Sequence, residues 1–298
     1  MQVERHASDL GRWRTVRRPA RPALRPFAGD LIGADSDLPA ALVERHLPSL
    51  SVGLLVNFGA PHRLLDRDGE RPGVGAWVVG LQTGLRLGHA AGARSFMIVQ
   101  LSPIGAHGIL RLPMDAITDR TVPLEDIDPQ FARDLVARTA AAADWPGRFE
   151  AAETLLAERL AGRSTALLAA RALARLTQAT EPPSVAALAD ELGCSHRHLI
   201  AQMQAGVGLS PKTVARIARF DRAVGAIHAA LRLQHRGEPH LDQAAPTGRG
   251  RRQDDVHWAD FAAAHGYYDQ AHLIRDFQAF GGASPAQFLA SLRPPATS

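Results

Sequence analysis

The chain contains very little cysteine and very little lysine. Cys194 is the only cysteine and Lys212 is the only lysine among 298 residues. A single cysteine excludes an intramolecular disulfide and a zinc site built from paired thiolates. Arginine therefore supplies nearly all of the positive charge. The formal net charge of +4 permits nucleic-acid binding but does not establish it.

Long apolar runs are also missing. The best candidates, such as residues 51–59, have only the length of a strand, whereas a membrane-spanning helix needs roughly 18 to 20 apolar residues. The first residues are basic but lack the apolar stretch and small-residue cleavage site of a secretory signal. We therefore expect a cytoplasmic protein without a membrane partner.

Motifs for catalysis and metal binding are absent as well. His62, His89 and His107 stand singly, without the clustered ligands of a metal-binding β-barrel, and such histidines are typical of ordinary surface or hydrogen-bonded positions. The sequence has no Ser-His-Asp arrangement and no phosphate-binding glycine loop. We expect no enzyme activity, no metal and no cofactor. A metal-binding β-barrel enzyme fused to a DNA-binding domain is kept as an alternative.

The N-terminal 180 residues divide into three parts by composition, and a 46% hydrophobic content is enough for more than one core. Residues 1–30, rich in Arg and Pro, predict an extended, mobile arm that contacts DNA phosphates or a partner subunit, or is simply solvated. Residues 31–128 predict a small antiparallel β-barrel or sandwich, because short apolar segments alternate with Gly and Pro. Residues 129–180 show helical periodicity, which fits a connector that forms a dimer surface or packs within its own subunit.

An internal repeat marks residues 181–298. The tripeptide HLI at 198–200 recurs at 272–274, and the pair SP at 210–211 recurs at 284–285, both with an offset of 74 residues. Each copy has a short apolar helix, a turn glycine, an N-capping side chain and a second amphipathic helix, as in a helix-turn-helix motif. The predicted elements are 185–192, Gly193, Ser195 and 196–205 in the first copy, and 258–265, Gly266, Asp269 and 270–280 in the second. Together these parts predict an α+β fold with an all-α C-terminal domain.

Two stretches of this repeat resemble the AraC/XylS family of bacterial transcription regulators: LADELGCSHRHLIAQMQAGVGLSPKTVARIARFDRAV and WADFAAAHGYYDQAHLIRDFQAFGGASPAQFLA. The resemblance covers roughly residues 183–292. It implies sequence-specific binding to double-stranded promoter or operator DNA, with the two recognition helices in adjacent major-groove segments about 34 to 36 Å apart.

Positions that match the family's recognition helices give the predicted DNA contacts. They are His196, Arg197, Ile200 and Ala201 in the first copy, and Gln270, Ala271, Ile274 and Arg275 in the second. Arginine grips guanine bidentately and glutamine pairs with adenine, whereas isoleucine and alanine touch only a thymine methyl. Arg197, Gln270 and Arg275 are therefore the strongest candidates for base reading, and a phosphate contact or a solvated position is the alternative for each.

The resemblance also implies a small-molecule effector bound by the N-terminal domain. The alternative is an effector-independent regulator whose N-terminal domain only mediates protein contacts. RNA polymerase and a second copy in a homodimer are further candidate partners. Effector-binding residues are not identifiable, since Phe58, Trp77 and Phe96 either line a cavity or fill the core. Residues 234–255, rich in Gly and charged residues, predict a flexible insertion between the two copies.

Overall fold

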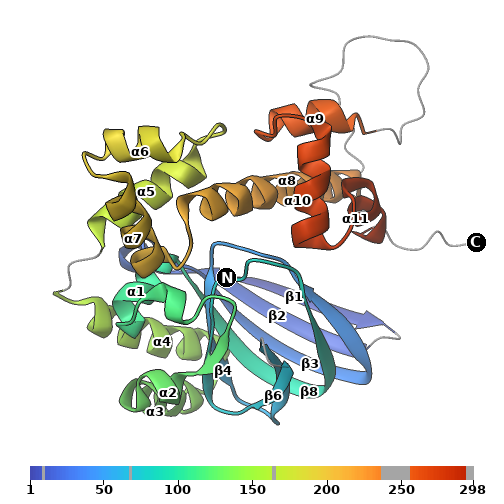
Figure 1. Cartoon of the computed structure of the whole chain (residues 1–298). Helices are drawn as coiled ribbons and strands as arrows, with labels where there is room; N and C mark the ends of the chain where they lie inside the picture. Colours follow the sequence, from blue (N-terminus) through green and yellow to red (C-terminus); the bar gives the residue numbers. More distant parts are fainter. Residues whose placement is uncertain (9–10, 67–68, 163–165, 236–255, 293–298) are drawn as a thin grey trace, which may run out of the picture.

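The computed structural model describes residues 1–8, 11–66, 69–162, 166–235 and 256–292. An antiparallel sheet is followed by helices (Figure 1), which confirms the expected α+β class. The strands are β1 (Gln2–Ser8), β2 (Gly11–Pro19), β3 (Ala28–His46), β4 (Val52–Asn57), β5 (His62–Asp66), β6 (Gly69–Gly73), β7 (Ala76–Val79), β8 (Arg86–Leu101) and β9 (Thr121–Pro123). Seven of them form one sheet in the order β1-β2-β3-β8-β4-β7-β9, and β5 pairs with β6.

The helices form two groups, and the first group covers one face of the sheet. The first group is η1 (Pro22–Leu24), α1 (Pro103–Leu110), η2 (Met114–Ala116), α2 (Leu124–Ile127), α3 (Pro129–Ala140) and α4 (Trp145–Leu160). The second group is α5 (Leu167–Gln178), α6 (Val185–Glu191), α7 (His196–Val207), α8 (Pro211–His235), α9 (Trp258–Ala264), α10 (Gln270–Gly281) and α11 (Pro285–Leu292). In Figure 1, α1 to α4 lie beside the sheet, and α8 passes above it toward α10.

Strands β4 and β8 alternate between two environments, as the period of two in a strand requires. On one face their apolar side chains join the main core with α1, α3 and α4: Val52, Leu54, Val56, Met97, Val99 and Leu101. On the other face, Leu55 joins a small second cluster with Trp77, against which Phe96 and Ile98 pack. The sheet is therefore apolar on both faces in its centre, and only one face is covered by α1 to α4.

Helices were predicted correctly in residues 129–180, where α3, α4 and α5 lie. Trp145 anchors the start of α4 on the sheet, because its indole N–H donates to Asp35 Oδ2 at 3.0 Å. Gly33 allows this contact, since a Cβ there would come within 2.3 Å of the Trp145 ring. Helices α3 and α4 pack together, whereas α5 packs against α7 and α8. Their apolar faces are thus used within the chain.

The prediction of a separate mobile arm at residues 1–30 is wrong for the described residues. Strands β1 and β2 fill most of the segment and continue the sheet beyond β3. Val16 is buried, and the arginines of β2 form ion pairs with carboxylates of β3, such as Arg17 with Asp30 at 3.6 Å. Arg18 also reaches the buried Glu153 of α4 at 2.9 Å. Positive charge alone suggested a solvated arm, but the negative partners are distant in sequence.

Candidate nucleic-acid interface

The first repeat copy forms a helix pair, with the short helix α6 followed by the longer helix α7. Gly193 adopts a left-handed φ of +68° in the turn. Ser195 caps α7, because its hydroxyl accepts a hydrogen bond from the backbone N–H of His198 at 3.2 Å. Leu199 and Met203 are completely buried. Since they lie four residues apart on one side of α7, the opposite side faces solvent.

The second copy repeats this construction with α9 and α10. Gly266 turns the chain with a φ of +77°. Asp269 caps α10 by accepting a hydrogen bond from the backbone N–H of His272 at 2.6 Å. Leu273 and Phe277, at the positions equivalent to Leu199 and Met203, are also completely buried. The helices, turn glycines and caps expected from the sequence are thus present in both copies.

The supporting helices α8 and α11 begin at Pro211 and Pro285, the prolines of the two repeated SP pairs. Ser284 and Gln287 form a reciprocal capping box, with the backbone N–H of each donating to the side chain of the other at 3.0 and 3.3 Å. Of the predicted insertion, residues 236–255 lie outside the described part of the chain.

The predicted contact residues occupy equivalent places in the two copies. The exposed ones are His196, Arg197, Ala201, Gln270, Ala271 and Arg275, while Ile200 and Ile274 are partly buried at the edge of each face. Arg197 and Arg275 make no ion pair within the described residues, so their guanidinium groups are available to an external acceptor. Each face thus offers one arginine for bidentate hydrogen bonding beside small or apolar side chains.

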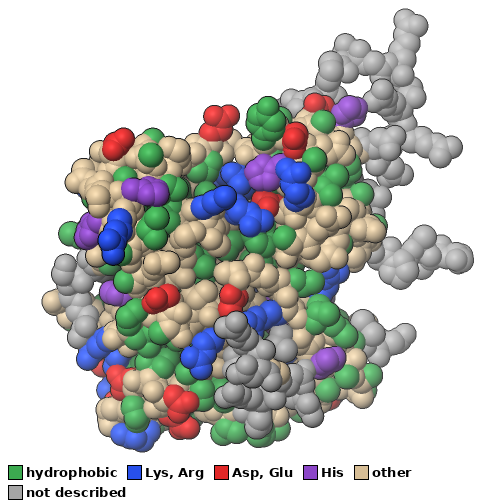
Figure 2. All heavy atoms as spheres, in the orientation of Figure 1, with side chains coloured by type: hydrophobic (Ala, Val, Ile, Leu, Met, Phe, Trp, Pro, Cys, Tyr) green, Lys and Arg blue, Asp and Glu red, His purple; other side chains and the backbone are tan. Residues whose placement is uncertain are grey.

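A group of arginines on α8 was not predicted as part of the site. Arg216, Arg219 and Arg222 recur every three residues and face α10 and the end of α5. Figure 2 shows cationic and histidine side chains gathered over α8 and α10, and a smaller group near α6 and α7 on the same face of the molecule. Their three-residue spacing in the sequence indicates that these arginines share one side of a helix. The sequence does not show which elements that side faces.

Asp276 is the carboxylate that ties α10 to α8. It is only 1% exposed, and its Oδ1 accepts hydrogen bonds from Arg216 Nε at 3.1 Å and Nη2 at 2.6 Å. His272, one turn earlier on α10, has its Nε2 atom 3.4 Å from Arg219 Nη2. Burial lowers the pKa of His272, and the charge of Arg219 lowers it further against the opposing effect of Asp276.

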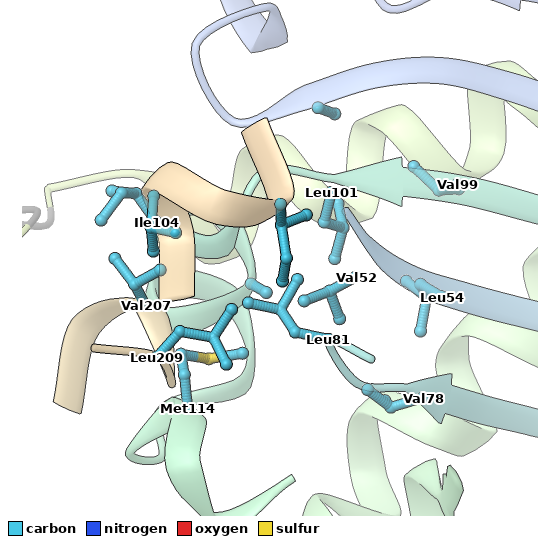
Figure 3. Close-up of a cluster of buried hydrophobic side chains, with 14 of the residues drawn as sticks. Val52, Leu54, Val78, Leu81, Val99, Leu101, Ile104, Met114, Val207 and Leu209 are labelled. Atoms are coloured by element: carbon cyan, nitrogen blue, oxygen red, sulfur yellow. The ribbon is translucent and has the colours of Figure 1, made fainter. Parts of the chain in front are cut away.

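The C-terminal ends of α7 and α10 rest on the N-terminal part of the chain. Gly208 ends α7, and its carbonyl accepts a hydrogen bond from Thr118 Oγ1 at 3.0 Å. Figure 3 shows the neighbouring Val207 and Leu209 in a cluster with Met114 and other core residues. At the C-terminal end of α10, Arg45 of β3 donates a hydrogen bond to the carbonyl of Gly281. In both repeat copies, therefore, the C-terminal end of the second helix contacts the N-terminal part of the chain.

A cavity of about 400 Å³ lies on the face of the sheet opposite α1 to α4. Leu55, Val79, Phe96 and Ile98 provide its apolar lining, and the polar side chains on its wall include Arg45, His46, Gln82, His89 and Arg94. Phe96 therefore lines a cavity, whereas Trp77 packs beneath it with Leu55. Phe58 packs against the main core, with its ring edge-on to Trp145 at 5.8 Å.

Metal ligands do not gather in the described ranges of the chain, where no group of three or more His, Cys, Asp or Glu side chains is placed to hold an ion. His89 is on the wall of the cavity and His107 is on α1, while the side chain of His62 lies outside the described residues. No helix among the described residues is long and apolar enough to cross a membrane.

Comparison with known families gives one match in the N-terminal part. A family model described as a domain of unknown function, DUF6597, matches residues 17–123. Comparison with curated proteins gives no match.

Solved structures with a similar chain arrangement include ToxT from Vibrio cholerae O395, at 10% identity and a TM-score of 0.44, with 96% of this chain and 99% of that chain covered. ToxT from strain SCE256 with a bound unsaturated fatty acid has 10% identity and a TM-score of 0.43, covering 87% and 98%. The AraC-like transcriptional activator CuxR has 11% identity and a TM-score of 0.26, covering 71% and 86%.

Proposed function

We propose that this protein is a transcription regulator that binds double-stranded DNA in a sequence-specific manner through α7 and α10. The observation that carries the proposal is the repetition of one arrangement, a capped helix with two buried apolar residues and an exposed arginine-bearing face, at two places in the same chain. A helix of this kind fits the major groove, and two of them read adjacent segments. Helices that only filled a core would not need the same exposed face twice.

Arg197, Gln270 and Arg275 are the side chains that we propose to read bases. Arg197→Ala and Arg275→Ala should each cost about 1 to 3 kcal/mol on the preferred site and relax the preference at one base pair. The experiment is a titration of each variant on the preferred duplex and on its single-base-pair variants, at stated salt. Arg171→Ala, at an exposed position on α5, is the matched control. An equal loss on every duplex would assign a phosphate contact instead.

The cavity on the sheet favours a second function, binding of a small-molecule effector by the N-terminal part. Its mostly apolar lining with a few polar side chains is typical of small-ligand sites. Its volume of about 400 Å³ is within the usual range of about 300 to 1,000 Å³ for such sites. The cavity shares Arg45 with the contact to α10, so a ligand there would act on the second helix pair. Thermal-shift screening of a metabolite library with the wild type and with Ile98→Trp, which fills the cavity, tests this function. Hits retained by the filled variant would exclude the cavity as their site.

A further inference from the structure

The surface between α8 and α10 holds more positive charge than its partners neutralise. Arg216, Arg219 and Arg222 lie on one side of α8, and Asp276 is the one buried carboxylate among them in the described chain. That carboxylate pairs with Arg216. Asp221 attracts Arg222, but burial and the charge of Arg219 together lower the pKa of Arg222. Arg219 and Arg222 thus repel each other in a partly desolvated place.

Hydrogen-bond donors in the same place also lack acceptors. Within the described residues, the hydroxyl of Tyr267 and the Nε atoms of Arg219 and Arg222 are buried and have no hydrogen-bond partner, although Arg222 Nη1 donates to the carbonyl of Thr177 at 3.1 Å. One acceptor in this place, Oδ2 of Asp276, is unpaired as well, so the unpaired donors outnumber it. Tyr267 is only 4% exposed, and its ring lies 5.6 Å from the guanidinium carbon of Arg219. Burial raises the pKa of Tyr267, so its hydroxyl stays protonated and acts as a donor. Buried donors without acceptors are rare in folded proteins and call for a missing partner.

We propose that Arg219, Arg222 and Tyr267 form a binding site for a phosphate-type oxyanion. Such a group is negatively charged and accepts several hydrogen bonds. It would therefore neutralise the excess positive charge and accept hydrogen bonds from the unpaired donors. Arg219 and Arg222 are partly exposed, which leaves their guanidinium groups a route to solvent. The two arginines lie on α8, which follows the first repeat copy and contacts α10 of the second. If the proposed function holds, the oxyanion is a phosphodiester group of the DNA strand that runs between α7 and α10.

Inorganic phosphate tests the site without DNA. The melting temperature is measured in phosphate and in chloride at equal ionic strength, for the wild type, Arg219→Gln, Tyr267→Phe and the control Arg171→Gln on α5. General stabilisation by phosphate through surface exclusion is common to all four proteins. We expect an additional stabilisation in the wild type and the control that is lost in Arg219→Gln and reduced in Tyr267→Phe. Equal phosphate effects in all four proteins would overturn the proposal.

DNA titrations over a range of salt concentrations identify the source of the oxyanion. If Arg219 contacts one backbone phosphate, Arg219→Gln lowers the slope of log K against log salt by about one and keeps the order of sequence preference. Arg219→Lys, which keeps the charge, should restore most of the slope. If Arg219→Gln loses the additional stabilisation by phosphate but keeps the salt dependence of DNA binding, the site binds a free phosphate compound and not the DNA backbone. If the wild type binds no DNA, the proposed function fails while the inorganic-phosphate result still decides the site.

Discussion

Single residues of the repeat have equivalent backbones but different surroundings, and the two turn glycines are the clearest case. Gly193 and Gly266 both have a positive φ. A Cβ at Gly193 would meet nothing within 4 Å, whereas a Cβ at Gly266 would lie 2.2 Å from the carbonyl oxygen of Thr180. The sequence pattern located both glycines, but it could not show that only the second packs against another segment.

The two glycines therefore predict unequal losses of stability. Gly193→Ala should cost about 1 to 2 kcal/mol, the strain of a left-handed alanine. Gly266→Ala adds a clash with Thr180 to the same strain, so its cost should be clearly larger. Unfolding in urea, followed by circular dichroism, gives both free energies. Equal losses would show that the chain near Thr180 moves away without cost.

His272 predicts a pH dependence of stability. Burial lowers its pKa in the folded chain, while in the unfolded chain it titrates near 6.5. Between these two values the unfolded chain binds more protons, so the stabilising contribution is complete above about pH 6.5 and is lost as the pH falls through the lower folded value. His272→Gln should therefore have a shallower loss of unfolding free energy on acidification than His198→Gln, its counterpart at the exposed repeat position. Identical pH profiles would contradict the effect of burial.

At the scale of whole elements, the sequence predicted helices better than the first strands. The helices α3 to α7, α9 and α10 follow from apolar periodicity that is local in sequence. Five of them, α3, α4, α6, α7 and α10, also begin at a side-chain cap. Strand β2 depends on pairing with β3 and on Glu153 of α4, more than a hundred residues away, and β1 in turn pairs with β2. A basic segment with distant partners resembles a solvated arm when it is seen alone. The cluster of arginines on α8 was missed for the same reason.

Among the described residues, the C-terminal ends of α7 and α10 each accept one hydrogen bond from a side chain of the N-terminal part, in addition to apolar packing at the end of α7. These two bonds predict selective loosening of the two helices. Arg45→Ala removes the bond to Gly281, and Thr118→Val removes the bond to Gly208. Arg45→Ala should speed amide hydrogen exchange at the end of α10 and leave α7 unchanged, because the two contacts are far apart in the fold. Thr118→Val should do the reverse. Exchange that rises in both helices in either variant would mean that the two pairs open together.

At the scale of the whole molecule, the two repeat copies are connected in two ways. Helix α8 follows the first copy and contacts α10 of the second, and the N-terminal part contacts the end of both α7 and α10. A cavity beside Arg45 places one of these contacts next to a potential ligand. The sequence predicted the repeat and an N-terminal β-rich part, but the location of the cavity depends on how β4, β7 and β8 pair. No local pattern specifies that pairing.

The most direct test of the account is selection of duplexes from a random DNA library by the purified protein, followed by sequencing. We predict a two-part motif with elements about ten base pairs apart, the spacing of adjacent major-groove segments on one face of the duplex. Arg197→Ala should lose preference in one element and Arg275→Ala in the other. Absence of any enriched motif with folded protein, in the presence and absence of cavity ligands from the thermal-shift screen, would contradict sequence-specific DNA binding by α7 and α10.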